Sequence, residues 1–178
     1  LGSSSLPAIV MPWIDGSRID LCAREAAIRA DKVTLKELAK GAERLGLEMI
    51  KGGFDHGDIS GANIIVDKTG KLWLIDPDTL RHCTVEDDDF HLREVGHEHY
   101  AHPNRSSSRW EDSLFRFPLE VLIVSLEGLA LMPELVHRFG NDDNSLLFKR
   151  GDLDDPDNSE LFGILCEEIG KRASRLKI

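Results

Sequence analysis

Apolar residues recur along this chain at spacings that predict helices in some segments and strands in others. Between Thr34 and Gly52 they recur every three or four residues, which is the period of an amphipathic helix. Thr34 and Glu37 match a capping box at the start of this helix, and Gly52-Gly53 is typical of a helix end. From Leu114 to Met132 the chain is apolar on nearly every side, which predicts a helix buried among other helices.

Shorter apolar runs predict strands. Leu6 to Trp13 indicates a buried strand that ends at Pro12. The runs Asn63–Asp67 and Lys71–Asp76, separated by a turn at residues 68–70, predict a β-hairpin. Residues 81–109 are polar and rich in histidine, and a loop of that length in a compact domain tends to be functional or disordered.

Weaker patterns complete the expected fold. Helical spacing is visible from Arg18 to Arg29, for a few residues after Pro133, and from Ser159 to Leu176. The residues Leu146 to Phe148 form a small apolar plug inside a polar loop. We therefore expect an α+β chain, mainly α, in which one strand and a hairpin precede most of the helices.

Composition narrows the class of protein. The chain has 178 residues, 41% of them hydrophobic and 30% charged, which fits one soluble globular domain. Its formal net charge of −10 argues against nucleic acid as a partner. No apolar run reaches the roughly 18 to 20 residues of a membrane span. The three widely spaced cysteines and the lack of a secretory signal pattern predict a cytoplasmic protein without a membrane partner.

Polar residues cluster around the expected hairpin. Asp58 is followed after four residues by Asn63, and the hairpin then leads to Asp76 and Asp78. A carboxylate can orient a hydroxyl group and receive its proton, whereas amide and carboxylate oxygens are ligands that Mg²⁺ prefers. The hairpin returns Asp76 to the end of the fold that holds Asn63, and Asp78 could supply an oxygen to a second metal. This order predicts a phosphoryl-transfer site; the alternative is a set of ordinary turn and cap residues.

The stretch from His56 to Asp76 resembles the H-x-D-x-x-x-x-N and D-x-x segments of the protein-kinase-like superfamily. Its His-Gly-Asp form is similar to aminoglycoside phosphotransferases and other kinase-like enzymes. The resemblance implies ATP and Mg²⁺ as cofactors and Asp58 as the base, in the catalytic loop with Asn63. It implies Asn63 and Asp76 as metal ligands and His56 as a structural support of the loop.

The resemblance covers nearly all of the chain and implies a kinase-like C-lobe with a catalytic β-hairpin. Residues 1–13 look like the last N-lobe strand and the hinge, where backbone groups of Met11, Pro12 and Trp13 would meet adenine. Residues 14–178 would form the C-lobe, so the N-lobe is expected to be largely absent from this chain. Gly96 to Pro103 lies where kinases carry the end of the activation segment.

Two later stretches, residues 116–131 and 144–156, resemble a bacterial subgroup of kinase-like proteins found in stress-response operons. That resemblance implies phosphorylation of Ser/Thr hydroxyls on a protein. It also implies a protein substrate or a regulatory partner, such as a phosphatase or a von Willebrand-type protein.

The chain also departs from the kinase pattern. No glycine-rich loop precedes Leu6, and neither the strand lysine nor its partner glutamate is present. Gly57 stands where many protein kinases carry arginine, and Pro77 replaces the usual phenylalanine after the metal-binding aspartate. Two alternatives therefore stay open: a pseudokinase or truncated module that acts as a binding scaffold, and a small-molecule kinase.

The polar loop suggests two further alternatives. His91, His97, His99 and His102 could supply three imidazole ligands to zinc, although no cysteine pair or HExxH helix supports that site. The acidic run from Glu86 to Asp89 is typical of a solvated loop, and the alternative is a docking site for a basic peptide.

Overall fold

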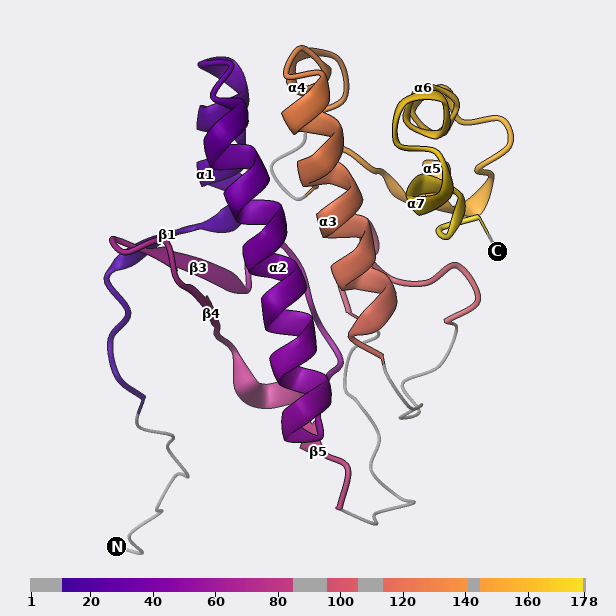
Figure 1. The fold of residues 1–178 in the computed structure, drawn as a ribbon. Coiled ribbons are helices and arrows are strands. Elements are labelled where there is room, and N and C mark those ends of the chain that lie inside the picture. The colour runs from indigo at the N-terminus through magenta and orange to yellow at the C-terminus, as the bar shows by residue number, and fades with distance from the viewer. Residues whose placement is uncertain (1–10, 85–95, 106–113, 141–144, 178) are drawn as a thin grey trace, which may run out of the picture.

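The computed structural model describes residues 11–84, 96–105, 114–140 and 145–177 (Figure 1). About half of the described residues are helical, and the α+β class expected from the sequence is confirmed. The first part of the chain contains β1 (Gly16–Arg18), α1 (Ile19–Ile28), α2 (Lys32–Gly52), β2 (Phe54–His56), β3 (Ile64–Asp67), β4 (Leu72–Leu74), a 3₁₀ turn (Pro77–Thr79) and β5 (Leu80–His82). The second part contains α3 (Arg116–Leu131), α4 (Leu135–Phe139), α5 (Arg150–Asp154), α6 (Glu160–Ile169) and α7 (Lys171–Ser174).

Helices α2 and α3 lie side by side at the centre of the fold (Figure 1). Gly46 lets them approach closely, because a Cβ atom there would come 2.7 Å from Cδ2 of Leu119. The apolar character of α3 is explained by its position, since most of its side chains are buried. Strands β2 and β4 pack against α2, whereas β1 and β3 pack against α1.

The expected capping box of α2 is wrong. The helix begins at Lys32, so Thr34 already lies in its first turn. Asp31 is the cap instead, and its carboxylate accepts the backbone N–H of Thr34 at 3.0 Å and the Thr34 hydroxyl at 2.6 Å. Glu37 pairs with Lys40 at 2.8 Å rather than with the cap. At the other end Gly53 adopts the left-handed conformation, as the Gly-Gly pattern predicted.

Two small antiparallel sheets carry the polar residues of interest. The first has the strand order β1-β3-β4, and Ile64 pairs with Leu74. The turn between β3 and β4 is closed by Asp67, whose carboxylate accepts hydrogen bonds from Thr69 and from the indole N–H of Trp73 at 2.8 Å. These bonds hold the pKa of Asp67 well below its ordinary value. The second sheet pairs β2 with β5 and was not predicted.

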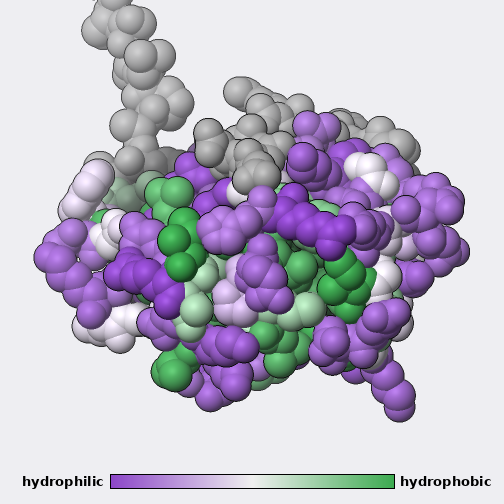
Figure 2. All heavy atoms as spheres, turned by 90° about the horizontal axis from the view of Figure 1, so that it is seen from above, coloured by the Kyte–Doolittle hydropathy of each residue, from purple (hydrophilic) through white to green (hydrophobic). Residues whose placement is uncertain are grey.

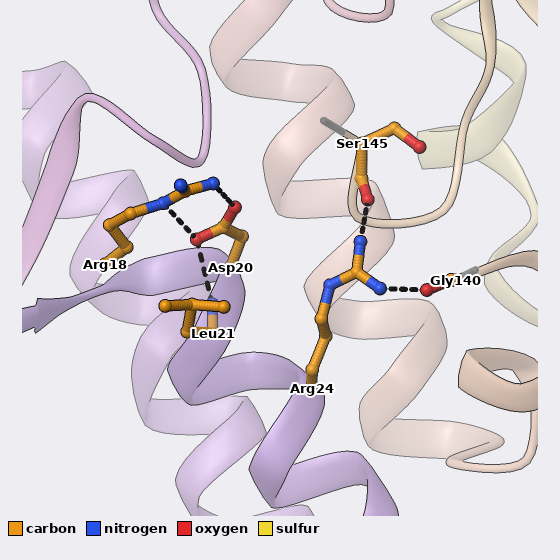
Figure 3. A network of polar contacts seen from close by, with 6 residues as sticks. All are labelled: Arg18, Asp20, Leu21, Arg24, Gly140 and Ser145. Atoms are coloured by element: carbon orange, nitrogen blue, oxygen red, sulfur yellow. Dashed lines mark hydrogen bonds and ion pairs between the residues drawn. The ribbon is translucent and has the colours of Figure 1, made fainter. Parts of the chain in front are cut away.

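Two arginines fix the start of α1 (Figure 3). Arg18 pairs with the buried carboxylate of Asp20, which also accepts the backbone N–H of Leu21 at 2.8 Å. Arg24 reaches across to the backbone carbonyls of Gly140 and Ser145. The two contacts of Arg24 tie α1 to Gly140 and Ser145, which lie more than 100 positions later in the sequence.

The C-terminal part packs against α3. The predicted apolar plug, Leu146 to Phe148, is buried in the core. The single helix expected from Ser159 to Leu176 is divided at Gly170, where φ is 60° and ψ is −120°, into α6 and α7. Arg172 then joins α7 to α2 and α3 through the carboxylates of Glu43, Glu120 and Glu127, at distances of 2.7 to 3.1 Å.

The surface seen from the α1–α4 end is mostly hydrophilic, with apolar residues showing in separate patches (Figure 2). Within the described ranges no helix combines the length and the hydrophobicity that crossing a membrane requires. Most of the strand predicted from Leu6 to Trp13 lies outside the described residues, as do the acidic run 86–89 and His91. Residues 11–13 are described and form no strand.

Candidate functional site

A buried imidazole joins the two halves of the predicted site. His56 is the last residue of β2 and is almost completely buried. Its Nδ1 accepts the backbone N–H of Asp58 at 3.1 Å, which leaves Nε2 to donate to the backbone carbonyl of Asp76 at 2.9 Å. Burial lowers the pKa of His56, although the hydrogen bond to Asp76 and the charge of Asp58 raise it in part. Because Nδ1 accepts an N–H group and so carries no proton, the ring is neutral, and it bridges the two loops.

The carboxylate of Asp58 is held through both of its oxygens. Asn63 donates its side-chain amide to Oδ2 at 3.0 Å and to the backbone carbonyl of the same residue at 2.9 Å. The backbone N–H of His97 donates to Oδ1 at 2.8 Å. Since the bonds from Asn63 use its NH₂ group, its side-chain oxygen is the atom left to face a cation.

Asp76 has a backbone conformation that is uncommon for a residue other than glycine. Its φ is 61° and its ψ is 67°, which places a non-glycine residue in the left-handed region. The conformation is fixed by the His56 bond to its carbonyl and by the preceding residue, where Ile75 donates its N–H to the Asn63 carbonyl at 2.9 Å. Asp76 is thus held beside Asn63 in the chain-reversing hairpin, and its side chain is exposed, as is that of Asp78.

The donor set fits Mg²⁺ better than zinc. Carboxylates from Asp76 and Asp78 and the amide oxygen of Asn63 are hard oxygen ligands, and Mg²⁺ commonly takes only one or two carboxylates beside phosphate and water. Among the described residues no group of three or more His, Cys, Asp or Glu side chains is arranged to hold a metal ion. The three described histidines of the zinc alternative use Nδ1 to accept backbone N–H groups from His99, Arg150 and Asn104, so the structure does not support that site.

The predicted hinge is exposed. Met11, Pro12 and Trp13 are all on the surface, and the Trp13 side chain is 91% exposed. Trp13 borders a shallow pocket of about 290 Å³ that is also lined by Lys68 and Trp73 from the β3–β4 hairpin. Trp13 of the predicted hinge therefore lies beside the β3–β4 hairpin, and a contact of residues 11–13 with adenine remains a prediction.

Several supporting residues of the site were missed by the sequence analysis. Asp55 precedes His56 and accepts the backbone N–H groups of Leu114 and Phe115, at 2.9 and 3.0 Å, at the start of α3. Arg105 donates Nη1 to the carbonyl of Gly57 at 2.9 Å. Asp55 could have been noticed because it stands directly before the His-Gly-Asp pattern, whereas Arg105 lies far from that pattern in the sequence.

The tyrosine of the 96–105 segment is part of the same support. Tyr100 is buried, and burial together with the charge of Asp20 holds the pKa of its phenol well above the ordinary value. Its hydroxyl lies against Gly61, where an added Cβ atom would come 3.1 Å from the phenol oxygen and 2.7 Å from the Asp20 side chain. The loop between Asp58 and Asn63 therefore packs against α1 and against the 96–105 segment.

Comparison with known proteins places this site in a family. A chain of the yeast RNA Pol II CTD kinase CTDK-1 complex matches with 20% identity and a TM-score of 0.40, over 59% of this chain and 36% of that chain. The present chain thus spans about a third of that protein's length. No curated protein sequence matches the chain. Residues 3–92, half of the chain and the part that contains every predicted site residue, match the ABC1 atypical kinase-like domain. The chain therefore belongs to the ABC1 atypical kinase-like family.

Proposed function

We propose that this chain carries the acceptor and metal side of an ATP- and Mg²⁺-dependent phosphotransferase that acts on a hydroxyl group, Ser or Thr on a protein. The observation that carries the proposal is the His56 bridge, with bonds of 3.1 Å to the Asp58 amide and 2.9 Å to the Asp76 carbonyl. It joins a candidate base to a candidate metal ligand through one neutral, buried ring. A set of independent turn residues would not need such a bridge.

Each residue has a distinct role in this proposal. Asp58 orients the acceptor hydroxyl and takes its proton, and Asn63 holds the Asp58 carboxylate while it presents its own oxygen to the metal side. Asp76 and Asp78 provide carboxylate oxygens there. Bound Mg²⁺ would neutralise charge on the phosphate oxygens during transfer. His56 takes no proton in this scheme, because Nδ1 accepts the Asp58 amide and Nε2 donates to the Asp76 carbonyl.

The nature of the acceptor is the finer part of the proposal. Family membership supports a kinase-like phosphotransferase. The choice of a Ser or Thr hydroxyl on a protein as the phosphate acceptor rests on the resemblance to kinases that act on these residues. A small alcohol is the alternative that an acceptor screen decides.

Calorimetric titration of ATP into the intact protein, with and without Mg²⁺, tests the proposal. Wild type should bind ATP in a Mg²⁺-dependent manner, and Asp76→Asn should lose that dependence. Asp58→Asn is the matched control: it should bind Mg²⁺-ATP like wild type but transfer labelled phosphate to Ser/Thr peptides about 10²- to 10⁴-fold more slowly. Failure of wild type to bind Mg²⁺-ATP would contradict the proposal and favour a binding scaffold.

A further inference from the structure

The segment Gly96–Arg105 contacts the Asp58 loop from both of its ends. Near its start the backbone N–H of His97 donates to Oδ1 of Asp58 at 2.8 Å. At its end Arg105 donates Nη1 to the carbonyl of Gly57 at 2.9 Å. The two contacts join residues that are 39 and 48 positions apart in the sequence, so they are made by the fold and not by the local turn.

The close approach depends on the residue at position 96. Gly96 has a φ of +81°, in the left-handed region, and a Cβ atom there would come 2.8 Å from the Gly57 carbonyl oxygen. The same atom would lie 3.4 Å from Oδ1 of Asp58. Any side chain at this position would therefore strain the backbone and push the segment away from the carboxylate.

The segment is itself anchored to the rest of the fold. His99 accepts the backbone N–H of Arg150 at 3.1 Å, and the Arg150 side chain donates to the carbonyl of Pro103 at 3.0 Å. Tyr100 is buried in the core, and the ring of His102 lies 4.8 Å from that of Phe117. The His97 amide is therefore carried on a fixed support rather than on a free loop.

We infer that the Gly96–Arg105 segment sets the orientation of the Asp58 carboxylate, with the backbone amide of His97 as the positioning group. Asn63 holds one oxygen and His97 the other, so rotation of the carboxylate is restricted before an acceptor arrives. The inference rests on the proposed function, in which Asp58 is the base. In that reaction the acceptor oxygen bonds to phosphorus, the bond to the leaving diphosphate oxygen breaks, and the hydroxyl proton passes to Asp58.

An NMR comparison tests the contact without any need for catalysis. The His97 amide proton is recorded in the wild type and in Asp58→Asn at the same neutral pH. Since the variant replaces the charged acceptor of the His97 N–H by a neutral group, the amide proton should move upfield in Asp58→Asn. A His97 amide that is unaffected by Asp58→Asn would overturn the inference, whether or not the protein transfers phosphate.

Gly96→Ala then tests whether the contact positions the base. Gly70→Ala is a matched control, because Gly70 has the same φ of +81° but nothing within 4 Å of an added Cβ atom. Both variants carry the same backbone strain, and only the first displaces the His97 amide. Gly96→Ala should lower kcat about 10- to 100-fold relative to Gly70→Ala, with Mg²⁺-ATP affinity unchanged.

The outcomes separate the two proposals. Equal kcat values in Gly96→Ala and Gly70→Ala would refute the positioning role. A His97 amide that responds to Asp58→Asn, in a protein whose wild type neither binds Mg²⁺-ATP nor transfers phosphate, would refute the proposed function and support the contact. If Gly96→Ala does not fold, Arg105→Gln replaces it, since it removes the second contact without a change at a strained residue, and the same fall in kcat is expected.

Discussion

Replacement of Asp55 by alanine should destabilise the protein more than the loss of an ordinary helix cap. The Asp55 carboxylate accepts three backbone N–H groups, from His56 at 2.8 Å, Leu114 at 2.9 Å and Phe115 at 3.0 Å. The last two stand at the N-terminus of α3, where backbone donors have no partner inside the helix. Asp55→Ala therefore removes the link between the strand of the site and the central helix.

The size of the effect follows from burial and charge. Leu114 and Phe115 are buried, so their N–H groups would lose a charged acceptor in a place that water reaches poorly. A hydrogen bond to a charged group contributes about 1.5 to 3 kcal/mol, and the loss of a cap alone costs about 0.5 to 2 kcal/mol. Because Asp55 is only half-buried, we expect Asp55→Ala to lower the free energy of unfolding by about 3 kcal/mol, which is a large part of a domain's stability.

Urea unfolding followed by circular dichroism measures this loss. Asp31→Ala is the control, since Asp31 caps α2 by the same chemistry on an exposed surface and should give a smaller loss. Asp55→Asn, which keeps one acceptor oxygen, should fall between wild type and Asp55→Ala. An Asp55→Ala loss no larger than that of Asp31→Ala would refute the argument that the α3 amides depend on this carboxylate.

Two further predictions concern pH and packing. Burial lowers the pKa of His56 from its ordinary 6.5, so the unfolded chain binds more protons than the folded one and stability should fall as the pH drops below about 6.5. Measured at several pH values, the free energy of unfolding should fall less steeply in His56→Gln than in the wild type. Equal slopes in the two proteins would contradict the assignment of this pH dependence to His56. Gly163→Ala in α6 has no atom within 4 Å of the new methyl group and should stabilise the protein by about 0.5 to 1 kcal/mol. In Gly128→Ala in α3 the new methyl group would lie 2.6 Å from the side chain of Leu165, so this variant should destabilise the protein by about 1 to 3 kcal/mol. Unfolding curves that show both variants stabilised, or both destabilised, would contradict this prediction.

The sequence predicted those elements whose pattern is local. The long helix α2, the buried α3 and the β3–β4 hairpin each have an apolar period or a turn sequence of their own, and all three are present. The pairing of β2 with β5 was missed because each has only three residues and they are joined across more than 20 positions. The capping box failed because Asp31 lies three residues before Thr34, outside the apolar pattern that marked the helix.

In the candidate site, too, the sequence predicted the side chains but not the backbone contacts that hold them. The residues predicted to act, Asp58, Asn63 and Asp76, would act through side chains that stand in a fixed order, and a sequence can display such an order. What holds them is largely backbone: the Asp76 carbonyl that His56 binds, and the His97 amide that Asp58 accepts. Every residue has such groups, so no residue type marks them. The left-handed Asp76 is the visible consequence, because a strained backbone persists only where the surrounding contacts determine it. The support of this site is therefore read from the fold, and its chemistry from the sequence.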